Sequence, residues 1–94
     1  MTNKYIVRGD RSGVFYGEIK ERNGNEVTMT NCRRLWYWDG ANSISQLAQR
    51  GTEEPSHCKF TVAVDKVIIL DAIEINKCSE IAIKNIDEVP AWIY

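Results

Sequence analysis

The sequence of 94 residues has no long hydrophobic run. The stretch from Val67 to Leu70 is apolar over only four residues, whereas a membrane-spanning helix needs about 20. The first residues, MTNKYIV, do not place a charged region before a long apolar segment, so we expect no secretory signal. These absences predict a protein of the cytoplasm that has no membrane partner.

Metal ligands and disulfide partners are also few. The sequence has one histidine, His57, and three cysteines, Cys32, Cys58 and Cys78. An odd number of widely spaced cysteines is not typical of a disulfide framework, and a structural zinc site needs about four ligands at workable spacings. We therefore expect reduced cysteines, no metal and no cofactor.

The sequence lacks the signatures of common catalytic sites. It contains no GxSxG turn, no P-loop, no HExxH motif and no glycine-rich dinucleotide turn after a strand. Asp71 stands in an otherwise apolar segment, but one such carboxylate is more often hydrogen-bonded structure than a general base. We predict that the protein is not an enzyme.

Charge is nearly balanced over the whole chain but not between its halves. The net charge of −1 argues against a binder of duplex nucleic acid. Residues 1–50 hold eight Lys and Arg against five acids, and residues 51–94 hold four Lys against eight acids. All six arginines lie in the first half. Because the guanidinium fork suits phosphate and carboxylate, we expect any anion site to lie there.

The hydrophobic pattern predicts one α+β domain over residues 1–94. We expect a mostly antiparallel, curled β-sheet of about six strands with two short helices, and the pattern leaves open one curled sheet or two packed sheets. Asn23-Gly24 is a strong hairpin signal, and Ser43 and Ser79 are candidate helix caps. The expected strands are 4–8, 14–20, 26–31, 33–38, 59–64, 67–75 and a terminal edge strand 91–94, and the expected helices are 42–50 and 80–87.

Three further expectations concern how these strands connect. A bend near Asn31-Cys32 is expected to separate strands 26–31 and 33–38. Asp65-Lys66 is expected to connect strands 59–64 and 67–75. The apolar start of the latter, from Val67 to Leu70, is expected to be buried on both faces of the sheet.

The segment Gly9-Asp10-Arg11-Ser12-Gly13 is the first candidate binding element. Consecutive amides in a glycine-flanked turn can form a nest for an oxyanion. Arg8 and Arg11 stand at its edges, and Asp10 offers a partner for an arginine or a ligand hydroxyl. The alternative is a plain turn in which the glycines only permit the backbone geometry.

The run Arg33-Arg34-Leu35-Trp36-Tyr37-Trp38 is the second candidate. Strand alternation predicts Arg34, Trp36 and Trp38 on one face, with Leu35 and Tyr37 on the other. Guanidinium groups beside indoles suit a phosphate next to a stacked base. Core packing and an oligomer or protein interface are the alternative readings of the same aromatic residues.

Several segments together resemble an uncharacterised family of small proteins of tailed phages and prophages, a domain of unknown function. These segments are KYIVRGDRSGVFYGEI, VTMTNCRRLWYWDGA, CKFTVAV and LDAIEI. The resemblance implies a phage accessory protein in the cytoplasm of an infected bacterial host. Small phage proteins of this kind often antagonise host defence, either by sequestering a nucleotide-derived immune signal or by covering the surface of a defence protein.

Together these observations predict a homo-oligomeric protein that binds a small anionic, nucleotide-like ligand. Arginines would hold phosphate, tryptophans would stack on a base, and Asp10, Asn31 and Asp39 would make polar contacts. The alternative is a protein–protein inhibitor of a host defence enzyme that acts through the aromatic and arginine residues or through the acidic second half. The candidate ligand-binding residues are Arg8, Asp10, Arg11, Asn31, Arg33, Arg34, Trp36, Trp38 and Asp39.

Overall fold

A computed structural model describes residues 2–93 of the chain. It has six strands and two α-helices, which confirms the expected α+β class. Tyr94, at the end of the expected terminal edge strand, lies outside the described residues. In chain order the elements are β1 (Tyr5–Gly9), β2 (Val14–Asn23), β3 (Glu26–Tyr37), α1 (Ile44–Arg50), the 3-10 turn η1 (Pro55–His57), β4 (Lys59–Phe60), β5 (Val64–Ile69), β6 (Ala72–Lys77) and α2 (Glu80–Glu88).

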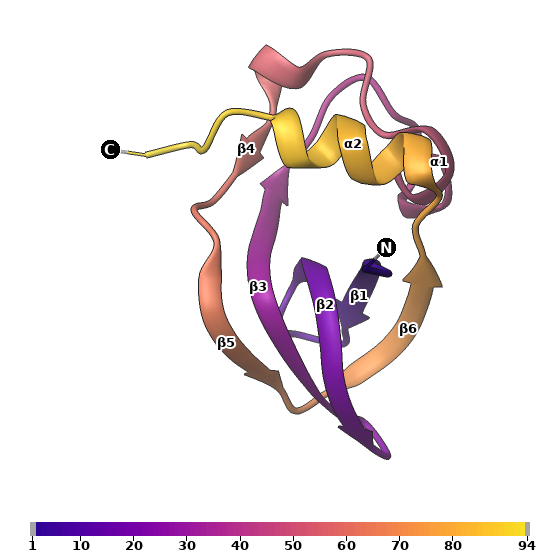
Figure 1. Cartoon of the computed structure of the whole chain (residues 1–94), viewed down its shortest axis with the longest axis vertical. Coiled ribbons are helices and arrows are strands. Elements are labelled where there is room, and N and C mark those ends of the chain that lie inside the picture. The colour runs from indigo at the N-terminus through magenta and orange to yellow at the C-terminus, as the bar shows by residue number, and fades with distance from the viewer. Residues whose placement is uncertain (1, 94) are drawn as a thin grey trace.

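The strands form one antiparallel sheet that is strongly curled (Figure 1). The strand order is β4-β3-β2-β1-β6, and β5 pairs with β3 on the same side as β4. β5 and β6 lie at opposite sides of the sheet, yet a two-residue turn, Leu70-Asp71, joins them at the lower end of Figure 1. Because so short a turn joins strands at opposite sides of the sheet, the sheet must be curved so that these two sides approach each other.

The expected break between strands 26–31 and 33–38 is wrong, because β3 is continuous from Glu26 to Tyr37. The chain forms a β-bulge at this point. Two residues of β3, Asn31 and Cys32, stand opposite the single residue Gly17 of β2, and Asn31 has a φ of 49°. A Cβ atom at Gly17 would lie 2.9 Å from the carbonyl oxygen of Asn31, so glycine makes room for the bulge.

The bulge resets the alternation of side chains along β3. Met29 and Cys32 are three residues apart, and regular alternation would place them on opposite faces. Both are nevertheless buried in the same hydrophobic cluster. Beyond the bulge, Arg33 pairs with Tyr16 and Arg34 pairs with Phe15, so neighbouring arginines point to opposite faces of the sheet.

The connections expected between residues 59 and 75 are also wrong. β4 is only two residues long, and Asp65 and Lys66 lie inside β5. The turn falls instead at Leu70-Asp71, and Leu70 is 70% exposed. Among the described residues β5 pairs only with β3, so it is an edge strand. The expectation that the segment from Val67 to Leu70 is buried on both faces is wrong, because Ile68 is 50% exposed and Leu70 is 70% exposed.

Both helices begin and end where the sequence signals predict. The Ser43 hydroxyl accepts a hydrogen bond from the Gln46 amide, and the Ser79 hydroxyl accepts one from the Ala82 amide. The helices cover the upper part of the sheet (Figure 1). Their buried side chains, including Leu47 and Ile86, pack against Ile6, Tyr16, Leu35 and Phe60 of the strands.

The sheet thus carries two hydrophobic cores on its two faces. We call the core under the helices the helix-side core. The second core consists of residues from the strands, and we call it the strand core. Its buried members are Val7, Phe15, Val27, Met29, Cys32, Ile69 and Ala72.

Candidate functional site

A hollow of about 260 Å³ lies between the β1–β2 loop and the end of β3. It contains four of the nine predicted site residues, from two segments that are distant in sequence. We call it the aromatic hollow, because two tryptophans contribute to its wall. Its lining residues are Arg11, Ser12, Gly13, Val14, Arg34, Leu35, Trp36 and Trp38.

Arg34 is held in place by three contacts around this hollow. Its guanidinium carbon lies 4.5 Å from the centroid of the Phe15 ring, a cation–π geometry. Its Nη1 donates a hydrogen bond to the carbonyl oxygen of Ser12, and its backbone N–H donates to Thr61 Oγ1 at 2.9 Å. The contacts with Phe15 and Ser12 therefore fix the position of the guanidinium, and the contact with Thr61 fixes the backbone.

The β1–β2 loop leaves no space for a side chain at Gly13. This residue has a φ of 117°, in the region that glycine favours, and a Cβ atom there would lie 2.9 Å from Arg34 Nη1. A larger residue would therefore displace the guanidinium from its position over Phe15.

The amides of the same loop already hold an oxyanion, and it belongs to the protein. The Asp71 carboxylate accepts hydrogen bonds from the backbone N–H groups of Arg11 and Ser12 at 2.8 and 3.1 Å. The Ser12 hydroxyl donates to it at 2.6 Å. These hydrogen bonds, chiefly the one from the Ser12 side chain, lower the pKa of Asp71 below its ordinary value. The structure therefore shows the amides of Arg11 and Ser12 bonded to a carboxylate of the protein itself, which is not the external anion considered from the sequence.

The arginines of the hollow are not neutralised by ion pairs. Among residues 2–93, neither Arg11 nor Arg34 lies within ion-pair distance of a carboxylate. Asp71 is close, but it is bonded to the loop amides. The aromatic hollow therefore presents two guanidinium groups and has no carboxylate in its lining.

The two tryptophans are placed differently from each other. Trp36 is 64% exposed, although it is a large apolar side chain. Trp38 follows the end of β3 and packs against the helix-side core. Strand alternation predicted Leu35 and Tyr37 on one face, but Leu35 is buried and Tyr37 is half exposed. The pairing of β3 with β4 is irregular between Leu35 and Tyr37, which disrupts the alternation there.

A second hollow of about 470 Å³ adjoins the first and shares Arg11, Ser12 and Arg34 with it. The rest of its lining is mainly aliphatic and comes from β5, from the β5–β6 turn and from Phe15 of β2. We call it the aliphatic hollow. Its other lining residues are Phe15, Val67, Ile68, Ile69, Leu70 and Asp71.

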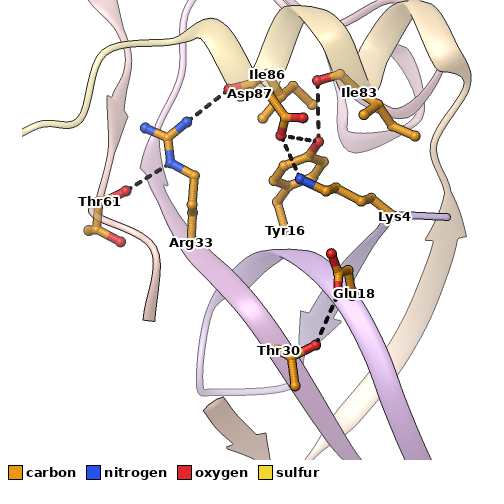
Figure 2. A network of polar contacts seen from close by, with 9 residues as sticks. All are labelled: Lys4, Tyr16, Glu18, Thr30, Arg33, Thr61, Ile83, Ile86 and Asp87. Atoms are coloured by element: carbon orange, nitrogen blue, oxygen red, sulfur yellow. Dashed lines mark hydrogen bonds and ion pairs between the residues drawn. The ribbon is translucent and has the colours of Figure 1, made fainter. Parts of the chain in front are cut away.

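Arg33 lies on the opposite face of the sheet and has a structural position. It is only 8% exposed, and its guanidinium bridges three backbone carbonyls, as Figure 2 shows in part. Nε donates to Thr61 at 2.8 Å, Nη1 to Ile86 at 2.8 Å and Nη2 to Phe60 at 3.2 Å. Burial lowers the pKa of this guanidinium. The contact with Ile86 also places a cation at the C-terminal end of α2, where the helix dipole favours it.

A polar network lies beside Arg33 under the last turn of α2 (Figure 2). The Asp87 carboxylate accepts a hydrogen bond from the Tyr16 hydroxyl at 2.8 Å and is ion-paired with Lys4 at 2.9 Å. Burial, followed by this hydrogen bond, raises the pKa of Tyr16 above its ordinary value. A hollow of about 450 Å³ borders the network, and it is lined in part by Asn31 and Arg33.

The three remaining predicted residues do not line any of these hollows. Arg8 is ion-paired with Glu74 at 3.7 Å, and the backbone N–H of Asp10 donates to the carbonyl of Asp71. Asp39 accepts a hydrogen bond from the Gly40 amide and lies 3.7 Å from the His57 ring. The structure therefore divides the predicted set, with Arg11, Arg34, Trp36 and Trp38 at one hollow and Asn31 and Arg33 on the other face.

Phe15 and Asp71 contribute to the hollows without having been predicted as ligand-binding residues. Ser12 does so too, although it lies within the predicted loop. The sequence contains no local signal for the contact between Asp71 and the loop, because the partners are about 60 positions apart.

Two further observations concern the described residues as a whole. No cluster of three or more His, Cys, Asp or Glu side chains within residues 2–93 has a geometry that could hold a metal ion. In the same range, neither helix has the length and hydropathy needed to cross a membrane.

Comparison with known proteins gives one match. The sequence model of one protein family, described as a domain of unknown function (DUF6948), matches residues 2–86. Neither the curated proteins nor the solved structures contain a match to this chain.

Proposed function

The chain belongs to the DUF6948 family, and we propose that it is a binding protein for a small anionic ligand that carries a planar ring. The observation that carries this proposal is the position of Arg34. Its guanidinium is fixed over Phe15 and beside Ser12, and it has no carboxylate partner among residues 2–93. The same aromatic hollow is lined by Arg11, which also has no carboxylate partner among residues 2–93, and by the exposed indole of Trp36.

Each of these groups supplies one part of the recognition of a nucleotide. Arg11 and Arg34 would bind phosphate oxygens through charge-assisted hydrogen bonds. Trp36 would stack on the base, a contact worth about 1–3 kcal/mol in other nucleic-acid-binding proteins. Exposure of this indole in the free protein has no packing benefit, whereas stacking on a ligand would remove its apolar surface from water.

The sequence resemblance to phage proteins supplies a biological setting for this binding. In an infected bacterium, a protein that holds a nucleotide-derived immune signal without converting it would lower the free concentration of that signal. We therefore propose sequestration as the biological role. The aromatic hollow has two arginines and no histidine or carboxylate in its lining, a composition suited to holding an anion.

The first test is the analysis of ligands that co-purify with the protein. The protein is isolated from bacteria with an active nucleotide-signalling defence, denatured, and the released small molecules are identified by mass spectrometry. We expect a phosphate-bearing compound in near-stoichiometric amount. Release of no such compound from cells that demonstrably produce the signal would contradict the proposed role.

Matched variants locate the site. Arg11→Ala and Trp36→Ala should abolish retention of the ligand and change the free energy of unfolding by less than about 0.5 kcal/mol, because both side chains are exposed. Arg22→Ala and Trp92→Ala remove the same side chains at positions outside the hollow and should retain the ligand. Equal retention by all four variants would place the ligand elsewhere.

A protein inhibitor is the second candidate function, and the number of exposed apolar side chains favours it. Ile68, Leu70 and Trp36 lie close to Arg11 and Arg34, and they are all at least half exposed. Tryptophan and arginine are also frequent in the energetically dominant positions of protein interfaces. A partner protein recognised this way would be retained by affinity purification from the host, and Leu70→Asp would prevent its retention.

A further inference from the structure

The proposed binding function leaves the second hollow unexplained. The aliphatic hollow and the aromatic hollow have separate walls, but both are lined by Arg11, Ser12 and Arg34. These shared residues lie where the two hollows meet. One ligand that occupies both hollows would therefore place its middle portion at the two guanidinium groups.

We propose, on the premise of the function above, that the ligand class is a dinucleotide, with two bases joined through a phosphodiester. The phosphodiester lies at Arg11 and Arg34, one base stacks on Trp36 in the aromatic hollow, and the other base occupies the aliphatic hollow.

Charge at the junction favours a diester over a phosphate monoester. The two guanidinium groups of the junction and the Asp71 carboxylate of the adjoining aliphatic hollow together amount to one positive charge. Hydrogen bonds from Ser12 and the loop amides keep Asp71 ionised. A phosphodiester carries one negative charge and neutralises the junction, whereas a monoester at neutral pH brings close to two.

The aliphatic hollow has the chemistry of a base-binding surface. Ile68 and Leu70 are exposed there and offer apolar contact to the face of a ring. Because β5 pairs only with β3 among the described residues, every second residue of β5 directs its N–H and C=O groups away from the sheet. Such backbone groups can donate to and accept from the polar edge of a base.

The position of Arg34 is also consistent with a ligand that crosses it. One face of its guanidinium lies on Phe15, and one edge is bonded to Ser12. The same guanidinium lies in the lining of both hollows. A phosphate bound there leaves both hollows open for its two substituents.

The test compares ligands that fill one hollow with ligands that fill two. Isothermal titration calorimetry would measure binding of the four dinucleoside monophosphates with identical bases, the four matching nucleoside monophosphates, and inorganic phosphate. We expect the best dinucleotide to bind at least about tenfold more tightly than its mononucleotide, because its second base buries apolar surface in the aliphatic hollow. Equal affinities would overturn the dinucleotide assignment and leave the proposed binding of a smaller anion intact.

A pair of matched variants assigns the second base to the aliphatic hollow. Leu70→Ser should lower dinucleotide affinity about tenfold and leave mononucleotide affinity unchanged. Ile81→Ser is its control, because Ile81 is exposed to the same extent, 71% against 70%, but lies on α2. An unchanged dinucleotide affinity in Leu70→Ser would overturn the assignment. If none of the compounds binds, the inference fails, while the proposed function is judged separately from the ligand released on denaturation.

Discussion

Arg33 and Arg34 are neighbours in sequence, and they show how different the two faces of this small sheet are. Arg33 points under α2, where it is nearly buried and donates hydrogen bonds to three backbone carbonyls. Arg34 points to the open face, where it rests on Phe15 beside two hollows. The helix-covered face holds its arginine by hydrogen bonds to the backbone, whereas the open face leaves its arginine exposed at the two hollows. Position in the fold, and not residue type, separates the two roles.

Removal of each arginine in turn gives the largest expected contrast. Arg33→Ala should lower the free energy of unfolding by about 3 kcal/mol, because it removes three hydrogen bonds made by a nearly buried guanidinium. Arg34→Ala should lower it by only about 1 kcal/mol, the cost of an exposed cation–π contact and one hydrogen bond. Urea unfolding followed by circular dichroism measures both values. The variants are charge-matched, so equal losses would contradict the comparison.

The dependence of stability on alkaline pH should show that both cores exclude water from their cysteine thiols, although helices cover only one of the cores. Burial raises the pKa of Cys78, a member of the helix-side core, to about 12, and nearby Asp87 adds to this shift. Burial raises the pKa of Cys32, in the strand core, to about 11. Above pH 9 the unfolded chain releases these protons while the folded chain keeps them. Stability is therefore complete below pH 9 and falls as the pH rises toward the folded pKa values.

The expected size is about 1 kcal/mol of unfolding free energy per thiol between pH 9 and pH 10. Cys78→Ala and Cys32→Ala should each remove about this much of the pH dependence, as measured by urea unfolding at both pH values. A variant that retains the full dependence would show that its thiol is accessible to water, and the two cores would then differ.

The smallest effect is expected at the β1–β2 loop on the open face. Asp71→Asn should increase the rates of amide hydrogen exchange of Arg11 and Ser12, because the carboxylate that accepts their hydrogen bonds is lost. The pKa of Asp71 is lowered in the folded protein. The wild-type contacts are therefore complete when the pH is above the ordinary pKa of an aspartate, and they are lost as the pH falls through the lowered pKa of Asp71. Asp65→Asn, on exposed β5, is the control, and unchanged exchange at both loop amides would contradict the role of Asp71.

Local signals in the sequence were enough to predict much of the fold. The Asn23-Gly24 turn, the serine caps of both helices and the glycine after α1 depend on residues that are adjacent or one turn apart. The β-bulge could not be predicted this way, because it depends on Gly17 in the neighbouring strand. The turn at Leu70-Asp71 also escaped prediction, since its polar partner lies in another loop.

The same distinction applies to the candidate site. The attraction of arginines and tryptophans to an anionic ring system is a property of the residue types. Four of the nine residues chosen on that ground, Arg11, Arg34, Trp36 and Trp38, line one hollow. Their separation from Arg33 depends on which face each strand position occupies after the bulge. Phe15 and Asp71 entered the site only through contacts between distant segments.

The β-bulge at Asn31 in β3 determines where the protein can tolerate the deletion of a single residue. Because side chains alternate along a strand, loss of Asn31 would turn every residue on one side of the deletion to the opposite face. Arg34 would then be directed into the apolar interior beneath α2, and Arg33 would take its place over the strand core. A family member that lacked this one residue would carry the same arginine pair with the two roles exchanged, so alignments of the family should be read for length at this position before they are read for residue identity.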